Sequence, residues 1–517
     1  MFVRKRENKT GSFSVQVVQK RGRRNVVVAT IGCSSSDVVV AELMKEGELY
    51  VQRASGQLQL DFDDERKALA RAMLSIQEIR STGLEQLLGR IYSDIGFDAL
   101  NEQLFKWLVL ARIVKPVSKL ATTEYLNRHH NYGVNVQAIY RFLDKLDEGL
   151  KDEVHRIAFD HTKSVLGGDV NVVFYDVTTL YFETALQDDL RVPGYSKDGK
   201  SQNPQILLGL LVAEHGYPIA YDIFEGNKFE GHTMLPVIDE LIARFKLQPP
   251  IVVADAGLMN RSNIEMLEQK DYRFILGARI KNLPKALQTE ILSLKLKDGE
   301  STSLKTSAGH RLVISYSSKR AKKDAKDRER GIERAQKLLE KDNLTKEKLS
   351  NHGYKKFITI QGQATLKLDK AKIREAARWD GLKGYLTNTE LDENIVMAKY
   401  SDLWEVERSF RITKHDLEAR PMFHRVERRI RAHICVCFAA LKVKKELERQ
   451  LKVNKAPYST DQAIAIAERI FSIKNTVPGT GEIVEVMRFE NHDQRQLATL
   501  FNFEIPEGNR LAGNLGV

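Results

Sequence analysis

Two short apolar runs, each leading into an aspartate, constrain the fold of this chain more than any other feature. Residues 171–179 read Asn-Val-Val-Phe-Tyr-Asp-Val-Thr-Thr and contain Asp176, and residues 249–257 read Pro-Pro-Ile-Val-Val-Ala-Asp-Ala-Gly and contain Asp255. Runs of this length and composition are typical of buried strands. We therefore expect Asp176 inside or at the end of one strand and Asp255 at the carboxyl end of another. Either residue has a structural alternative, because aspartate also caps turns and the helices that follow them.

A third acidic residue, Glu407, lies in a segment with helical periodicity. Side chains at steps of three and four residues share one helix face, and here they are Trp404, Glu407, Arg411, Lys414 and Glu418. Leu403, Val406, Phe410 and Leu417 form the apolar flank. The alternative for Glu407 is a surface ion pair with Arg411, which stabilises a helix by only about 0.2–0.5 kcal/mol. Three carboxylates of this kind have the donor chemistry to hold two divalent cations.

The pattern of residues 170–280 predicts an α/β fold class. Mixed strands are followed by alternating helices and strands, which is the pattern of a sheet covered by helices. The expected strands are 172–176, 179–183, 206–213, 218–224, 251–254 and 274–278, and the expected helices are 235–245 and 264–269.

The charge of the chain favours a nucleic-acid partner. Its 517 residues include 81 Lys and Arg against 69 Asp and Glu, a formal net charge of +12. No apolar run approaches the ~20 residues of a membrane-spanning helix, so a membrane partner is not expected. Cys33, Cys435 and Cys437 lack the spacing of a zinc site or a disulfide framework, which indicates a cytosolic protein.

A chain of this length is expected to divide into several domains. Residues 1–64 alternate around Arg21-Gly22-Arg23-Arg24 and predict a basic β-hairpin region, and residues 65–165 predict a helical DNA-binding region. Within the latter, Ser118–Leu146 is either a helix-turn-helix that presents Gln137, Tyr140, Arg141 and Lys145 or a plain helical linker. The charged stretch Lys319–Lys348 predicts a solvated helix, with DNA contact through Lys319, Arg320, Lys322 and Lys323 as the alternative.

The spacing of Tyr400, Glu407 and Lys414 resembles the Tyr-x2-Arg-x3-Glu-x6-Lys signature of DDE transposases of bacterial insertion sequences. Those enzymes form the cut-and-paste branch with a β-rich insertion before the last acid. This chain departs from the signature at the arginine, where it has Leu403. Residues 420–433 also resemble the stretch that follows the glutamate in one subgroup of that branch. The resemblance covers about residues 165–450.

The resemblance implies a ribonuclease H-like catalytic core, in which the first and fourth strands are neighbours and Asp176 lies beside Asp255. The core would comprise residues 166–280 and 396–450, interrupted by a β-rich insertion at 281–395 and followed by a C-terminal helical region at 451–517. Asp176, Asp255 and Glu407 would be the catalytic residues and the ligands of two Mg²⁺ ions, for which Mn²⁺ can substitute, with Asp176 bridging both ions. Phosphodiester cleavage by two such ions is a common mechanism.

The same resemblance implies which side chains meet DNA. Tyr400 and Lys414 would contact phosphate, and a set of arginines would add salt-sensitive backbone contacts: Arg411, Arg425, Arg428, Arg429 and Arg431. His232 is expected either to line the cleft or to cap the next helix, and Trp404 frames the predicted active-site helix.

The implied partners are double-stranded DNA at the element ends and at the target, bound by a homodimer. The implied location is the cytoplasm of a bacterium, in association with the nucleoid. Two other functions remain open from the sequence: a catalytically silent DNA-binding regulator derived from a transposase, and a ribonuclease H-like nuclease without strand transfer.

Overall fold

The computed structural model describes residues 1–8, 11–55, 75–146, 148–184, 186–195, 202–258, 260–340, 357–361, 365–476 and 481–509. The described chain divides into two compact units, each of which is treated by itself. The first comprises residues of Met1–Ile79 and Ile473–Val486 with 507–509, and the second comprises Arg80–Ser472 and Met487–Pro506. The predicted active-site residues all belong to the second unit.

The N-terminal unit begins with an antiparallel sheet of β1 (Phe2–Glu7), β2 (Phe13–Arg21) and β3 (Arg24–Ser34). Strands β2 and β3 form a hairpin in which Arg21 pairs with Arg24, and Gly22 takes the positive φ of 60° that its two-residue loop requires. Helix α1 (Asp37–Ala54), which the sequence did not predict, packs against all three strands and covers Val15, Val17 and Val18.

A small sheet of three strands follows the order β17-β16-β4, with β4 at Ile76–Ser81, β16 at Phe471–Thr476 and β17 at Ile483–Arg488. Residues 451–517 were expected to be helical. Their described part contains helices α16 (Thr460–Glu468) and α17 (His492–Leu500), but also these two strands. The alternation in Ile483-Val484-Glu485-Val486 is the strand signal that the helical expectation overlooked.

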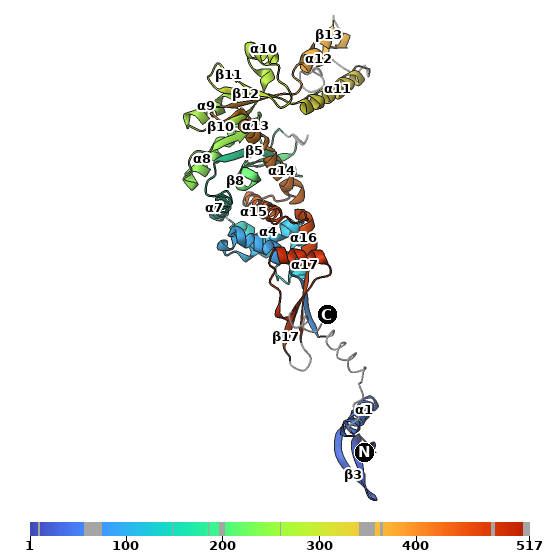
Figure 1. The fold of residues 1–517 in the computed structure, drawn as a ribbon. Helices are drawn as coiled ribbons and strands as arrows, with labels where there is room; N and C mark the ends of the chain where they lie inside the picture. The colour runs from blue at the N-terminus through green and yellow to red at the C-terminus, as the bar shows by residue number, and fades with distance from the viewer. Residues whose placement is uncertain are drawn as a thin grey trace. The chain divides into compact units, whose positions relative to one another are not determined.

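A large mixed sheet forms the centre of the second unit (Figure 1). Its strands follow the order β11-β12-β15-β10-β9-β5-β7-β6, with β8 paired to β7. Strand β5 is parallel to β9, β9 is parallel to β10, and the other pairs are antiparallel. The bounds are β5 Val172–Tyr181, β6 Val192–Pro193, β7 Pro204–Ala213, β8 Pro218–Glu225, β9 Ile251–Ala254, β10 Phe274–Ala278, β11 Ser301–Lys305, β12 Arg311–Tyr316 and β15 Leu382–Thr387.

The segment predicted as a separate β-rich insertion, residues 281–395, is joined to this sheet. Strand β15 hydrogen-bonds to β10, and β12 and β11 follow it outward. Only β13 (Ile358–Gln361) and β14 (Thr365–Leu368) form a sheet of their own. The segment also contains helices α10 (Lys285–Ser293), α11 (Ser318–Glu340) and α12 (Lys370–Ala377), so it is mixed α/β rather than β-rich. Helix α11 covers the described part of the charged stretch that was predicted as a helix.

Two hydrophobic cores lie on opposite faces of the central sheet. Alternate residues of β5 enter each one: Val172 and Phe174 face the first core, and Val173, Tyr175 and Val177 face the second. The second core is covered by α8 (Met234–Phe245), α9 (Arg261–Gln269) and α10. The first core is covered by α15 (Glu427–Val453), which lies between β8 and the N-terminal helices (Figure 1).

The helices that precede the sheet share this first core. They are α3 (Arg90–Ile95), α4 (Gln103–Val114), α5 (Lys119–His130), α6 (Val136–Lys145) and α7 (Glu148–Val165). Because α4 and α6 both pack against α15, the predicted domain boundary at 165/166 does not separate two compact units. Helices α5 and α6 do form a helix pair, and Gln137, Arg141 and Lys145 are exposed on it.

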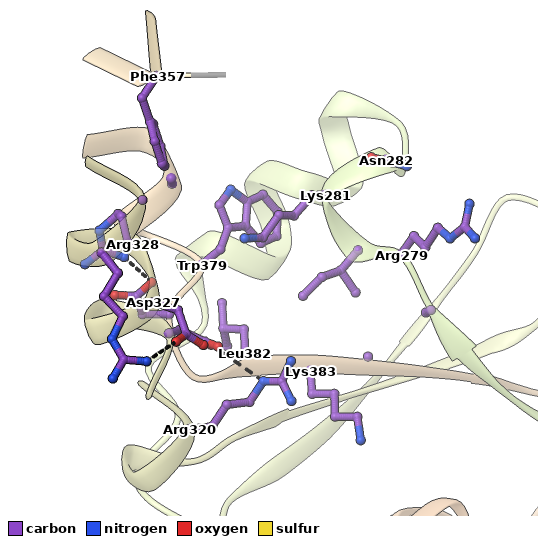
Figure 2. Close-up of a pocket in the computed structure, with 18 of the residues that line it drawn as sticks. Arg279, Lys281, Asn282, Arg320, Asp327, Arg328, Phe357, Trp379, Leu382 and Lys383 are labelled. Atoms are coloured by element: carbon purple, nitrogen blue, oxygen red, sulfur yellow. Dashed lines mark hydrogen bonds and ion pairs between the residues drawn. The ribbon is translucent and has the colours of Figure 1, made fainter. Parts of the chain in front are cut away.

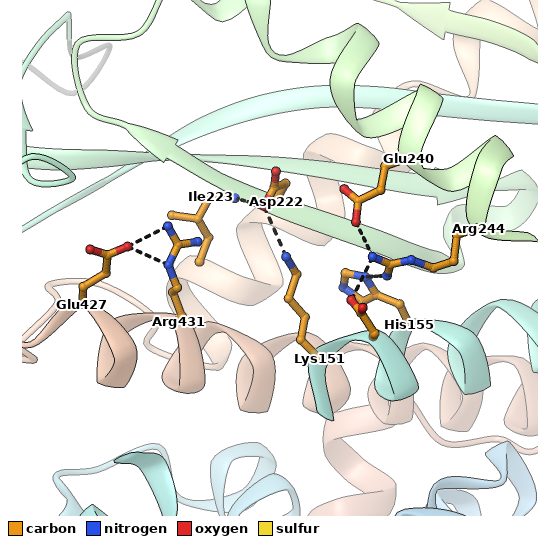
Figure 3. Close-up of polar contacts among 9 residues, drawn as sticks. Lys151, His155, Asp222, Ile223, Glu240, Arg244, Glu427 and Arg431 are labelled. Carbon is orange, nitrogen blue, oxygen red and sulfur yellow. Dashed lines mark hydrogen bonds and ion pairs between the residues drawn. The ribbon is translucent and has the colours of Figure 1, made fainter. Parts of the chain in front are cut away.

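Polar contacts fasten α7 to the sheet side of the core (Figure 3). The Lys151 ammonium of α7 lies 3.4 Å from Asp222 of β8, and Arg244 of α8 lies 2.8 Å from Asp152 of α7. The same guanidinium is 3.3 Å from Nδ1 of His155, whose pKa is lowered by burial and by the charges of Lys151 and Arg244. Burial keeps the His155 imidazole neutral, and a neutral imidazole can accept a hydrogen bond from the Arg244 guanidinium without charge repulsion.

Candidate active site

The strand register brings Asp176 and Asp255 next to each other. Tyr175 of β5 pairs with Ala254 of β9 in parallel register, so Asp176 and Asp255 occupy the next position on each strand path. The alternation of side chains places both on the face of the first hydrophobic core, since Phe174 and Val253 belong to it. Both aspartates are half-buried.

Local backbone bonds orient one oxygen of each aspartate. Asp255 Oδ1 accepts the N–H groups of Gly257 at 2.8 Å and Leu258 at 3.2 Å, and Asp176 Oδ1 accepts the N–H of Val177 at 2.8 Å. Asp255 therefore does cap the turn after β9, but the N-cap of α9 is Asn260. Among the described residues, Oδ2 of Asp255 has no hydrogen-bond or ion-pair partner, so that oxygen is available to a ligand.

Glu407 reaches the same side of the sheet from helix α14 (Trp404–Arg411). This helix packs against β5 and β7 through Val406 and Phe410, which belong to the first core, while Glu407 itself is exposed. The alternative for Glu407, an ion pair with Arg411, is not formed: within the part of the chain that the structure describes, the Glu407 carboxylate has no ion-pair partner. Its exposure and lack of a partner fit a ligand-binding role better than a stabilising one.

Tyr400 lies within electrostatic range of the three carboxylates. It lies on α13 (Glu393–Ser401), its ring packs edge-on against Tyr385 at 4.9 Å between centroids, and its hydroxyl lies close to Gly277. A Cβ at Gly277 would collide with that hydroxyl, so only glycine fits there. Burial raises the pKa of Tyr400, and the charges of Asp255, Tyr385, Glu407 and Asp176 raise it further.

The donor chemistry fits divalent cations, but the acids do not form a closed ligand shell. Carboxylate oxygens are the donors that Mg²⁺ prefers, and Asp255 and Glu407 each present oxygens without protein partners. Within the described residues, however, no group of three or more His, Cys, Asp or Glu side chains is placed to hold a metal ion.

The active-site helix differs from the single helix that the spacing predicts. Helix α13 ends at Ser401, α14 begins at Trp404, and residues Ile412–Asp416 form a π-helical turn that carries Lys414. Leu403, which stands where the resembled signature has arginine, is only 8% exposed and belongs to the first core. Its side chain anchors the joint between the two helices, so this position does not face a substrate.

The other predicted residues of this helix lie at its surface. Trp404 is 49% exposed, with the Arg408 guanidinium 5.8 Å from its ring, and Arg408 itself pairs with Glu448 at 2.7 Å. Arg411 is exposed, and Lys414 is half-buried. The predicted apolar flank of Leu403, Val406, Phe410 and Leu417 is buried.

Three of the four predicted DNA-binding arginines after residue 420 are engaged in ion pairs. Arg428 and Arg429 both bind Asp144 of α6, and Arg429 does so through two bonds of 2.7 and 2.6 Å. Figure 3 shows Arg431, which pairs with Glu427 at 2.8 Å. Arg428 and Arg429 both lower the pKa of Asp144. Arg425 is exposed. The Asp144 pairs hold α6 against the start of α15, which is a structural role that the sequence did not indicate.

His232 neither caps the next helix nor contacts the three acids through any described bond. It ends the short helix Glu230–His232, is exposed, and packs edge-on against Phe229 at 5.4 Å. The N-cap of α8 is Thr233.

Lys383 of β15 lies beside Tyr400, and the sequence did not predict it as a candidate site residue. Its ammonium lies 4.4 Å from the centroid of the Tyr400 ring and 5.2 Å from that of Tyr385. Burial lowers the pKa of Lys383, as does the charge of Arg320, whereas the charge of Glu407 raises it. No local signal could have found this lysine, because only the pairing of β15 with β10 brings it to the acids.

Comparison with protein families identifies the class of protein. A family model described as the transposase DDE domain matches residues 168–442, a span that contains Asp176, Asp255 and Glu407. The chain belongs to this family. Among solved structures, this transposase-family chain is similar to a piggyBac transposase in a synaptic complex with hairpin DNA, with 10% sequence identity, a TM-score of 0.38, and coverage of 78% of this chain and 79% of that one. A search of curated proteins finds no match. None of the described helices is both long and apolar enough to cross a membrane.

Proposed function

We propose that this chain is an active DDE transposase of a bacterial insertion sequence, which cleaves DNA at the element ends and joins it to a target. The observation that supports the proposal is the parallel register of β5 and β9, which puts Asp176 next to Asp255 within the span matched by the transposase family model, with Glu407 on a helix that packs against β5. The order of the strands supports a ribonuclease H-like core, because β5, β7 and β8 are successive antiparallel neighbours and β9 and β10 are added in parallel on the other side of β5.

In this proposal the three carboxylates would hold two Mg²⁺ or Mn²⁺ ions, which when bound supply an activated oxygen nucleophile and charge neutralisation at phosphorus. The chain's own groups position the phosphate. The Tyr400 phenol is protonated at neutral pH, and its raised pKa keeps it protonated in more alkaline solution, so its hydroxyl can donate to a phosphate oxygen. Lys414, with the exposed Arg411 and Arg425, would bind neighbouring phosphates, and the end-binding contacts would come from the regions before residue 165.

The test is cleavage and joining of a DNA duplex that carries the ends of the parent element. We expect Asp176→Asn, Asp255→Asn and Glu407→Gln each to abolish Mg²⁺-dependent cleavage while binding in Ca²⁺ persists. Glu418→Gln, which neutralises an exposed glutamate after the π-helical turn, is the matched control and should cleave normally.

The outcomes separate the alternatives. Binding without cleavage by the wild-type protein would indicate a silent regulator, and cleavage without joining would indicate a nuclease. Full activity of Glu407→Gln would remove Glu407 from the site. Sedimentation of the protein with and without end DNA would test the proposed homodimer.

A further inference from the structure

A large cleft lies on the segment between the second and third acids. It has a volume of about 800 Å³ and is lined by the short helix Ile280–Asn282, by α11, and by the chain that leads from α12 into β15 (Figure 2). None of the residues that the resemblance assigned to catalysis or DNA binding lines it.

The lining of the cleft has an excess of positive charge. Among its described residues, seven Arg or Lys side chains face three Asp side chains. Each aspartate already has an arginine partner: Asp324 with Arg320 at 3.6 Å, Asp327 with Arg330 at 3.8 Å, and Asp380 with Arg328. Arg279 and Arg334 are exposed at the cleft and have no ion-pair partner in the described part of the chain. The surplus of positive charge in the cleft therefore favours a polyanionic ligand.

The floor of the cleft indicates which part of a nucleic acid it fits. Phe357 and Trp379 are 3% and 4% exposed, so neither ring offers a free face on which a base could stack. The groups that remain accessible are guanidinium and ammonium groups, which recognise phosphate rather than bases.

The cleft adjoins the acidic site through one side chain. Lys383 belongs to the cleft lining, and its ammonium also lies 4.4 Å from the Tyr400 ring centroid. A strand whose backbone follows the cleft past Lys383 would arrive at Tyr400.

We propose that this cleft binds the phosphodiester backbone of the DNA strand that enters the active site, with Arg279 and Arg334 holding flanking phosphates and Lys383 positioning the phosphate next to Tyr400. The inference rests on the proposed function, since it concerns the same substrate. Under this proposal the segment between Asp255 and Glu407 forms part of the DNA path. Its contacts go to the phosphate backbone and therefore do not depend on the base sequence.

The first test measures DNA affinity against salt concentration in Ca²⁺, so that cleavage does not enter. Each lost phosphate contact should lower the slope of log affinity against log salt by about 0.9, so Arg279→Ala/Arg334→Ala should lower it by about 2. Lys372→Ala/Arg374→Ala, at two exposed α12 positions outside the cleft, removes the same charge and should keep the wild-type slope. Equal slopes for the two double variants would overturn the proposal.

The second test concerns Lys383. Lys383→Met should lower the cleavage rate at saturating DNA at least tenfold while changing affinity little, and Lys383→Arg should restore part of the rate, because a cation that positions the reacting phosphate acts on turnover. Unchanged turnover in Lys383→Met would exclude the positioning role. If the wild-type protein cleaved no DNA, the proposed activity would fail, and the salt slopes would still decide whether the cleft binds the backbone.

Discussion

Lys442 provides a stringent test of how α15 is packed. Its side chain is fully buried, its ammonium donates to Thr162 Oγ1 and lies 4.7 Å from the Tyr217 ring centroid, and Glu446 and Arg449 lie nearby. Burial lowers the pKa of Lys442 from 10.5 to about 7, while Glu446 opposes the shift. Below pH 7 both the folded and unfolded chains hold the proton. Between pH 7 and 10.5 only the unfolded chain does, so this group makes stability rise with pH.

The size of the effect follows from the shift. One proton difference changes the free energy of unfolding by about 1.4 kcal/mol per pH unit, so Lys442 should contribute a rise of about 4 kcal/mol between pH 7 and pH 10. Lys442→Met keeps a long unbranched side chain without the charge. The variant should therefore be more stable than the wild type by about 4 kcal/mol at pH 6, and the advantage should disappear near pH 10.

Tryptophan fluorescence during urea unfolding is the appropriate assay, because Trp107, Trp379 and Trp404 all belong to the second unit. Lys455→Met, at an exposed position after the end of α15, controls for the loss of one lysine. A stability difference between Lys442→Met and the wild type that stays constant from pH 6 to pH 10 would refute the burial of this ammonium against α7.

Three further predictions follow from the site. Tyr400→Phe should lower cleavage about tenfold without changing urea stability, because it removes a single donated hydrogen bond; normal cleavage in a substrate titration would show that the hydroxyl does not meet the phosphate. Leu403→Arg should destabilise the second unit by about 2–5 kcal/mol in the same fluorescence assay, because it buries a charge, whereas Leu403→Met should cost less than about 1.5 kcal/mol. Asp144→Asn should steepen the salt dependence of DNA binding by about 1–2 in slope if Arg428 and Arg429 then reach phosphates, and an unchanged slope would assign them a purely structural role.

The sequence predicted the elements of the core well because their signals are local. The β-branched runs before Asp176 and Asp255 are strands, and the apolar periodicity around Met234–Phe245 is a helix. The adjacency of the two aspartates is different, since it depends on which strands pair, and periodicity carries no information about pairing. Only the resemblance implied it, and the parallel register of β5 and β9 now provides it.

The structure around Glu407 was only partly predictable from the local sequence pattern. Steps of three and four residues are compatible with one continuous helix, yet the chain breaks it between Ser401 and Trp404 and widens it into a π-helical turn at Ile412–Asp416. The break turns Leu403 into the core, so a residue that the signature would direct toward DNA instead fixes the angle between α13 and α14. The exposure of Glu407 and the burial of Val406 and Phe410 nevertheless follow the predicted pattern, because they lie within the regular part of α14.

The pairing of β15 with β10 makes the segment between Asp255 and Glu407 part of the central sheet rather than an addition to it. An insertion that only decorated the sheet could be removed without affecting the acids. Here, removal of residues 281–395 would take away Lys383 and would leave β10 as an unprotected edge strand, with its hydrogen-bonding groups open to another chain. It would also remove Tyr385, against which Tyr400 packs. The segment therefore completes both the sheet and the surroundings of Tyr400.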